Sequence, residues 1–301
     1  MNNKKQAFAL RGTICYSSSQ TELSVTERGY LICEDGRCVG VFGELPEKYA
    51  GIECTDFGDE LIIPGLTDLH LHAPQYTFRS SGMDLELLDW LNTYTFPQEA
   101  RYADIDFAKE AYSIFVEDMK KSPNTRACMF GTLHVPATEL LMEMLDKTGM
   151  KTMVGKVNMD RNGSLELQEE SAQASADATV QWIEDTLDKF ENVKPILTPR
   201  FTPSCSDELM EKLSEIQKKY HLPMQSHLSE NFGEIAWVKE LCPNTHFYGE
   251  AYSQFDLFGG DCPTIMAHCV HSSDEEIALM KKQGVYIAHC PQSNTNLCLL
   301  Y

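Results

Sequence analysis

The sequence predicts an α/β fold, a TIM-like (β/α)8 barrel that is incomplete, with about seven of its strands present, preceded by a small β-sandwich segment. From residue 61 onward, short apolar runs typical of buried strands alternate with patterns typical of amphipathic helices. This alternation indicates a parallel sheet with helices outside it. Histidines follow several of the apolar runs, and a barrel carries its chemistry at such strand ends. The 301 residues also exceed the roughly 250 that a barrel requires.

Residues 1–60 are interpreted as a small N-terminal β-domain, the first part of a split domain. The runs 30–33 and 37–42 flank an Asp-Gly pair, which is typical of a β-hairpin. The alternation of strands and helices starts after residue 60. Residues 61–301 are therefore expected to form the barrel, which lacks strand eight.

The barrel strands are expected in short apolar runs, with the helices between them. The strand candidates are residues 61–71, 126–133, 152–159, 193–201, 222–228, 263–268 and 284–289. The helical patterns cover residues 104–121, 137–148, 171–190, 206–220, 231–241 and 273–282. A Rossmann-type sheet would carry G-x-G-x-x-G after its first strand, and a P-loop fold a glycine-rich turn before Lys-Ser/Thr. Neither motif occurs, so the barrel is favoured over these two folds.

The composition excludes several classes of protein. A net charge of −20 at pH 7 argues against a nucleic-acid partner, because the phosphate backbone has to be met by Lys and Arg. No apolar run approaches the roughly 20 residues of a membrane helix, and the N-terminus does not resemble a signal peptide. The 11 cysteines lack C-x-x-C spacings, which favours reduced thiols over disulfides or a cysteine zinc site. A cytoplasmic protein without a membrane partner is expected.

Two histidines at the end of the first barrel strand form a candidate metal site. His70 and His72 are separated by one residue, so in an extended segment both side chains point to the same side. His227, His268 and His289 each close another short apolar run. Histidines at successive strand ends would form a ring, although an isolated His-x-His pair is a weak signal with a structural alternative.

Several motifs carry a family resemblance. Residues 64–72 (PGLTDLHLH) resemble the first-strand motif of the amidohydrolase superfamily. Residues 226–230 (SHLSE) and 267–269 (AHC) resemble the fifth- and sixth-strand motifs of its deaminase branch. More narrowly, the chain is similar to the guanine deaminases in residues 72–76, 90–97, 155–160 and 198–201. The combination of motifs is more specific than any single one.

The resemblance implies one zinc ion held by the two first-strand histidines, the fifth-strand histidine and an aspartate on strand eight. His70, His72 and His227 match the first three ligands. Neutral imidazoles suit Zn²⁺, and three protein ligands plus a water form an open catalytic site. Zinc would lower the pKa of that water to about 7. Iron is an alternative, because imidazole ligands suit both metals.

By the same resemblance, Glu230 is the proton shuttle. It lies three residues after His227 and would carry a proton from the water to a ring nitrogen of the purine. Attack on C2 of guanine and loss of ammonia would then give xanthine. His268 matches a histidine near the water and the substrate. A buried, hydrogen-bonded histidine without a chemical role is the alternative for His268.

The resemblance also implies that Gln75, Arg200 and Phe201 bind the substrate. Gln75 and Arg200 are expected to hydrogen-bond the polar edge of the purine, while Phe201 packs on the flat ring. Such pairing would favour guanine over purines without the matching groups, because unpaired buried polar groups are costly. The alternatives are that Arg200 caps a strand end and that Phe201 is a core aromatic residue.

The chain ends at Tyr301, before the strand-eight aspartate of the family pattern. A barrel without its last strand is expected to have open edges and to be unstable or to associate. A site without the aspartate is expected to bind metal weakly and to turn over poorly. The complete protein is expected to be a homodimer, by resemblance.

The main hypothesis is hydrolytic deamination of guanine to xanthine and ammonia, a step of purine catabolism. The first alternative is another aminohydrolase of the same branch that acts on a different purine, a pterin or a triazine. The second alternative is an inactive fragment that binds purine or metal and releases no ammonia. Ammonia release from guanine, adenine and adenosine would separate these hypotheses.

Overall fold

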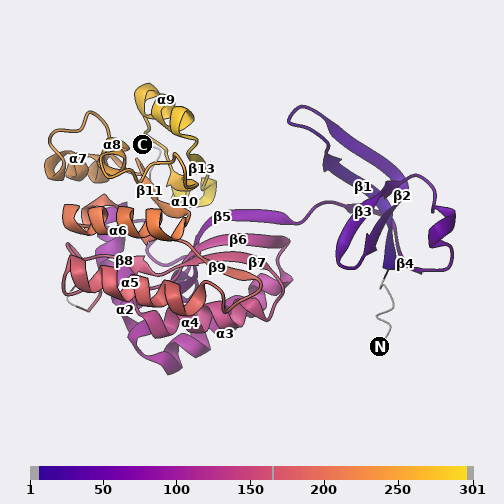
Figure 1. Ribbon diagram of the computed structural model, residues 1–301, viewed down its shortest axis with the longest axis horizontal. Helices are drawn as coiled ribbons and strands as arrows, with labels where there is room; N and C mark the ends of the chain where they lie inside the picture. The colour runs from indigo at the N-terminus through magenta and orange to yellow at the C-terminus, as the bar shows by residue number, and fades with distance from the viewer. Residues whose placement is uncertain (1–6, 165, 297–301) are drawn as a thin grey trace. The chain divides into compact units, whose positions relative to one another are not determined.

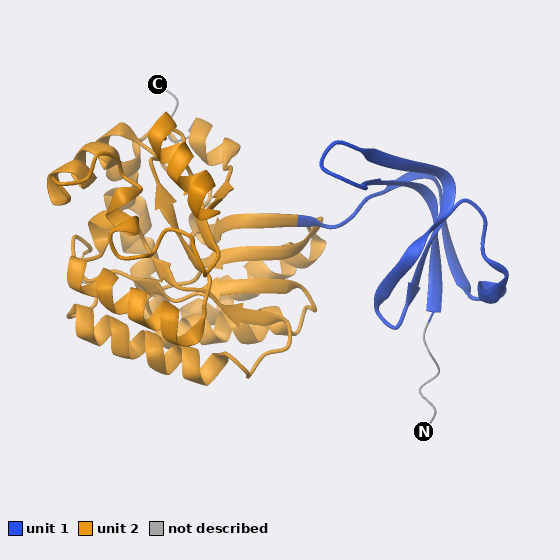
Figure 2. Ribbon diagram, turned by 45° about the horizontal axis from the view of Figure 1, so that its top comes forward, with its two compact units in different colours: residues 1–66 blue, residues 67–301 orange. Residues whose placement is uncertain are grey.

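The structure is a computed structural model that describes residues 7–164 and 166–296 (Figure 1). The chain divides into two compact units, residues 1–66 and residues 67–301 (Figure 2). The boundary thus follows residue 66, whereas the sequence predicts it after residue 60. The reason is that the last strand of the first unit continues to Ile62 and belongs to that unit's sheet.

The first unit contains one four-stranded sheet. Its strands are β1 (Ala7–Ser17), β2 (Leu23–Glu34), β3 (Arg37–Phe42) and β4 (Glu53–Ile62), with the 3-10 helix η1 (Glu47–Tyr49) before β4. The strand order is β3-β2-β1-β4, and β1 is antiparallel to β2 and parallel to β4. The expected hairpin joins β2 and β3, where Asp35 and Gly36 have φ angles of 52° and 75°, as a type I′ turn requires.

The first unit has a small apolar core on its sheet. Ala9, Ile32 and Tyr49 are its buried members. Within residues 7–66 the strands form one sheet, and the two packed sheets of the expected β-sandwich are not found there. Strand β4 accordingly has almost entirely exposed side chains, because no second sheet covers it in this described part.

The second unit contains a series of parallel strands that follow one another in chain order. They are β5 (Leu66–His72), β6 (Asn124–Phe130), β7 (Lys151–Gly155), β8 (Val157–Asn158), β9 (Val193–Pro195), β10 (Thr198–Pro199), β11 (Met224–Leu228), β12 (Thr264–His268) and β13 (Tyr286–Ala288). Hydrogen bonds give the orders β5-β6-β7-β9, β8-β10 and β11-β12-β13. A parallel bridge between Leu197 and Met224 joins the first part of the series to β11. The predicted α/β fold with parallel sheets is confirmed.

The long helices lie outside these strands (Figure 1). They are α3 (Ile105–Lys121), α4 (Val135–Asp146), α5 (Ala172–Thr186), α6 (Asp207–Tyr220), α7 (Phe232–Leu241) and α9 (Asp274–Gln283), close to the predicted ranges. Side-chain caps fix most of their starts, for example Asp104 before α3 and Ser206 before α6, which satisfies backbone donors of the first turn. Trp182 of α5 and Leu141 of α4 are fully buried in the core against the strands. Among the described residues, no helix combines the length and the apolar character needed to cross a membrane.

Several short helices were not predicted from the sequence. They are η2 (Ala73–Phe78), α1 (Leu87–Trp90), the π-helical segment η3 (Leu91–Thr95), α2 (Phe96–Ala100), η4 (Arg101–Ala103), η5 (Thr202–Ser204), α8 (Glu250–Ser253) and α10 (Pro291–Asn296). Helices of one or two turns give no detectable 3.6-residue period. Four of them, η2, α1, η3 and α10, contribute residues to the pocket described below.

A buried ion pair interrupts the predicted strand 152–159. The side chain of Lys156, between β7 and β8, is fully buried and pairs with Glu169. The other carboxylate oxygen of Glu169 accepts from the backbone N–H of Met159 at 3.1 Å. Removing one partner of a buried pair leaves the other charge uncompensated, which is strongly destabilising.

We expect Glu169→Gln to lower the free energy of unfolding by about 3 kcal/mol, measured by chemical denaturation. Glu117 is the matched control, because it is 59% exposed and pairs with Lys120 at the surface. Glu117→Gln is expected to change the free energy of unfolding by less than about 1 kcal/mol. Equal losses in the two variants would contradict the assigned role of the Lys156 pair.

Candidate active site

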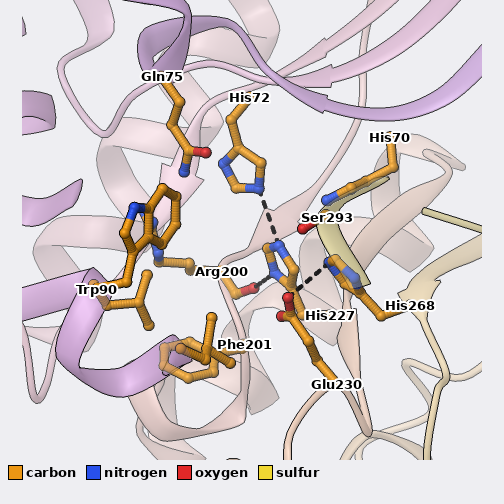
Figure 3. A pocket seen from close by; sticks show the side chains of 12 residues that line it. His70, His72, Gln75, Trp90, Arg200, Phe201, His227, Glu230, His268 and Ser293 are labelled. Carbon is orange, nitrogen blue, oxygen red and sulfur yellow. Dashed lines mark hydrogen bonds and ion pairs between the residues drawn. The ribbon is translucent and has the colours of Figure 1, made fainter. Parts of the chain in front are cut away.

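Histidines from three separated strands meet at one end of the second unit. His70 and His72 lie on β5, His227 on β11 and His268 at the end of β12. The ring centroid of His70 lies 5.1 Å from that of His72 and 4.9 Å from that of His227. One nitrogen each from His70, His72 and His227 lies within 4.8 Å of the other two. The structure therefore brings the predicted ligands together (Figure 3).

The arrangement of His72 and His227 fits a metal ion between them. Their Nε2 atoms lie 3.0 Å apart, and two nitrogens bound about 2.1 Å from a tetrahedral ion lie roughly 3.4 Å apart. The Nδ1 of His227 lies 2.6 Å from the carbonyl oxygen of Arg200. A carbonyl only accepts, so Nδ1 carries the proton and Nε2 keeps a free lone pair. This is the tautomer of a metal-ligating histidine whose second nitrogen is held by the protein.

The charge state of the cluster also suits a metal. Burial, and then the neighbouring histidines, hold the pKa of His70, His72 and His227 well below the usual value. The rings are therefore neutral near pH 7, and neutral imidazole is the form that binds a metal. Catalytic zinc sites have three protein ligands, and three imidazoles are one of the donor sets that such sites use.

A second set of candidate ligands shares His70. It combines His70 with His268 and with Cys290, which was not predicted from the sequence. Burial raises the pKa of the Cys290 thiol to about 11, whereas the thiolate is the ligating form. His268 is held by two other groups, since its Nδ1 lies 2.8 Å from Oδ1 of Asn294 and its Nε2 lies 3.3 Å from Glu230. The set of His70, His72 and His227 therefore fits a metal better.

Glu230 lies on the loop after β11 and is 4% exposed. Burial raises the pKa of its carboxyl group to about 8, against the opposing charge of Arg200. Its backbone N–H donates to Glu234 at 3.0 Å, which fixes the loop. A carboxyl group that can hold and release a proton near neutral pH is the type of group that general acid–base catalysis uses.

The backbone has an unusual conformation at the ends of β11 and β12. Ser229 and His268 have φ angles of 48° and 71°, in the left-handed region that residues other than glycine rarely adopt. The N–H of Cys269 donates to the carbonyl of Leu228 at 2.9 Å, and the N–H of His271 donates to the carbonyl of Ser229 at 2.9 Å. These bonds hold the two strained ends side by side, and such strain is typical of functional sites.

The histidine cluster opens into a pocket that contains every predicted site residue. The pocket is lined by His70, His72, Gln75, Leu87, Trp90, Leu91, Arg200, Phe201, His227, Glu230, His268 and Ser293 (Figure 3). The metal candidates and the predicted substrate contacts thus share one cavity. Their roles in binding and catalysis remain predictions.

Arg200 pairs with a carboxylate that was not predicted from the sequence. Both Nη atoms of Arg200 donate to Glu99 of α2, with an Nη2–Oε1 distance of 3.2 Å. The Nε2 of Gln75 donates to the same Oε1 at 3.0 Å. Arg200 and Glu99 are each only 2% exposed. The guanidinium of Arg200 therefore forms an ion pair beside the pocket. The backbone carbonyl of Arg200 contacts Nδ1 of His227.

Phe201 is a buried aromatic residue at the wall of the pocket. It is 4% exposed and belongs to an apolar cluster with Trp90 and Leu91. It also lines the pocket and lies edge-on to Trp237 at 6.2 Å. Phe201 is thus a core aromatic residue that also borders the pocket, and its packing on a substrate ring stays a prediction.

The comparison with known proteins identifies the family. The model of the "Amidohydrolase family" matches residues 61–298, which is most of the chain. The chain belongs to the amidohydrolase family. The family is generally metal-dependent, in agreement with the histidine cluster, and the resemblance recognised in the sequence is confirmed.

Similar amidohydrolases include several guanine deaminases. That of Dictyostelium discoideum is 44% identical over 243 residues, which are 80% of this chain and 53% of the relative. That of Escherichia coli is 34% identical over 286 residues, 91% of this chain and 62% of the relative. A crystal structure of guanine deaminase from C. acetobutylicum with bound guanine matches 97% of this chain and 69% of its own, with 46% identity and a TM-score of 0.93. The chain spans about half the length of the Dictyostelium relative.

Proposed function

We propose that this amidohydrolase converts guanine and water to xanthine and ammonia. The observation that carries the proposal is the union, in one pocket, of a neutral three-histidine cluster, the carboxyl group of Glu230 and the polar pair Gln75–Arg200. The similarity to guanine deaminases, one of them solved with guanine in its active site, supports the choice of substrate.

We propose zinc as the metal, held by His70, His72 and His227. Zinc at this position would lower the pKa of a water molecule so that a nucleophile is available near neutral pH. The lone pair that His227 directs at His72 supports this assignment, because the Arg200 carbonyl occupies the other ring nitrogen. Iron is the alternative, since imidazole ligands also suit it.

Glu230 is proposed to move the protons of the reaction. Its carboxyl oxygen lies 3.3 Å from Nε2 of His268, on the wall of the pocket that also holds the metal candidates. It would accept a proton from water and give it to a ring nitrogen next to C2, which makes C2 more electrophilic. The oxygen of that water would bond to C2, and its second proton would pass to the 2-amino group. The C2–N bond then breaks, so that ammonia leaves and the oxygen remains on C2 as the carbonyl of xanthine. His268 orients Glu230 in this proposal.

The test is ammonia release from guanine by the purified protein supplied with zinc. Guanine is expected to be turned over, with adenine and adenosine far slower. Faster release from adenosine than from guanine would favour the alternative aminohydrolase. Binding of guanine without any ammonia would favour the inactive purine-binding alternative.

Metal removal provides a separate prediction. After treatment with 1,10-phenanthroline and desalting, activity on guanine is expected to fall to background because the nucleophile is no longer activated. Stoichiometric zinc is expected to restore it, and anaerobic ferrous iron serves as the comparison that distinguishes the metals. Full activity in a sample shown by elemental analysis to contain no metal would contradict this prediction.

A further inference from the structure

Glu99 lies behind the pocket wall and contacts two residues that face the pocket. Its carboxylate accepts from Arg200 through both Nη atoms and from Gln75 through Nε2. Glu99 itself does not line the cavity, whereas Gln75 and Arg200 do. The ring of Phe96, on the same short helix, stacks on the guanidinium, with 5.0 Å between its centroid and Cζ of Arg200. Any effect of Glu99 on a ligand therefore acts through its two partners.

The first consequence is that the amide of Gln75 has a fixed orientation. A carboxylate only accepts hydrogen bonds, so the Gln75 atom that faces Glu99 has to be the NH₂ group. The carbonyl oxygen Oε1 then faces the other way, and Figure 3 shows it on the side of His72. Gln75 therefore offers the pocket a hydrogen-bond acceptor.

The second consequence is that the Arg200–Glu99 ion pair offers the pocket N–H donors but carries no net charge. A guanidinium has five N–H groups, and the carboxylate of Glu99 occupies only some of them. Because Glu99 and Arg200 are both almost completely buried, the carboxylate compensates the positive charge at close range. The pair favours a neutral ligand over an anion that would otherwise neutralise Arg200.

We propose that Glu99 is a positioning residue that sets the substrate specificity of the pocket for a neutral lactam edge, an N–H next to a C=O. The acceptor of Gln75 and the donors of Arg200 are complementary to these two groups. Guanine carries such an edge at N1 and O6, while 2,6-diaminopurine carries the same 2-amino group and an amino group in place of the oxygen. The inference rests on the proposed function and deepens it.

The test compares kcat/KM for guanine with that for 2,6-diaminopurine. The parent protein is expected to prefer guanine by about 100-fold or more, because a site built to hydrogen-bond a group strongly rejects an analogue without it. Glu99→Gln can donate to the oxygen of Gln75 and allows that amide to turn. We expect kcat/KM of this variant to fall on the order of 100-fold for guanine and far less for 2,6-diaminopurine. The ratio of the two kcat/KM values should therefore fall at least tenfold.

Two further variants separate positioning from structural damage. Glu169→Gln is the matched control, because it also removes a carboxylate from a buried cation, Lys156, which does not line the pocket. This control is expected to change kcat/KM for both substrates by the same factor. Glu99→Asp keeps the charge with a shorter side chain and is expected to restore part of the preference. If Glu99→Gln lowers kcat/KM by the same factor for both substrates, so that the ratio of guanine to 2,6-diaminopurine is unchanged, the inference is overturned.

The charge of the ligand gives the second readout. Xanthine carries the same lactam edge as guanine and becomes an anion in mildly alkaline solution, and Glu99→Gln leaves the charge of Arg200 uncompensated. Calorimetry at acidic and at alkaline pH compares the neutral and the anionic form, which share that edge and differ in charge. The ratio of alkaline to acidic xanthine affinity should be roughly tenfold higher in Glu99→Gln than in the parent protein. An unchanged ratio would oppose the inference.

Failure of the proposed function remains distinguishable. If the parent protein binds guanine in preference to 2,6-diaminopurine but releases no ammonia, the catalytic proposal fails, and the effect of Glu99→Gln on the two binding constants tests Glu99. If the parent protein shows no preference in binding or in turnover, Glu99 does not set specificity for the lactam edge.

Discussion

The variant Glu230→Gln is expected to lower kcat for guanine by about 10²–10⁴-fold while its zinc content stays unchanged. The amide keeps the shape of the carboxyl group but cannot cycle a proton between water and the purine ring. Glu230 is not a member of either set of candidate metal ligands, so the metal should remain bound. Steady-state ammonia release and elemental analysis of the same sample measure the two quantities.

The control for this variant is Glu275→Gln, at an exposed carboxylate in the first turn of α9. It makes the same chemical change and is expected to keep kcat within about twofold, as most surface substitutions have small effects. A Glu230→Gln protein that retained substantial turnover would refute the role of Glu230 as shuttle. A loss of zinc in that variant would assign Glu230 to the metal site.

The variant His227→Ala is expected to lose both the metal and the activity. His227 directs its unprotonated Nε2 at Nε2 of His72, 3.0 Å away, so its removal takes away one of the three proposed ligands. Loss of an outer partner typically costs about 10–100-fold in metal affinity, and loss of a direct ligand should cost more. Zinc stoichiometry after extensive dialysis, with kcat at saturating guanine, measures the effect.

His289 is the matched control for the metal prediction, because it is an exposed histidine directly after β13 and outside the pocket. His289→Ala is expected to retain zinc and activity. Full zinc occupancy in His227→Ala would show that the metal lies elsewhere, and the set of His70, His268 and Cys290 would then become the candidate.

The positions of the predicted site residues follow from a local rule. His70, His72, His227 and His268 lie at or near the ends of strands that pair in parallel, and parallel strands bring such ends to the same edge. The same rule selected His289, which is exposed and lies outside the pocket, so strand ends narrowed the candidates and the family resemblance selected among them. The strand 193–201 was predicted in the correct place but is interrupted at 196–197, between β9 and β10.

Glu99 shows where this local rule ends. It lies 101 residues before Arg200 in the chain, on a helix of five residues with no detectable period. A buried glutamate and a surface glutamate are the same letter in a sequence, and 45 acidic residues offer many candidates for the partner of one arginine. The sandwich expected for the first unit is not confirmed, since its described strands form one sheet, and packing between sheets is a long-range property that local patterns do not show.

The sequence by itself determined the parallel α/β architecture, the histidines and carboxyl group of the candidate site, and the family to which the chain belongs. The architecture follows from short-range periodic patterns along the chain, whereas the site residues and the family follow from motifs that resemble those of the amidohydrolases. Only the tertiary structure decided which nitrogen of His227 is free, which way the Gln75 amide points and what neutralises Arg200. Each of these depends on a hydrogen bond between residues far apart in the chain, whose geometry exists only after the strands and short helices have packed together.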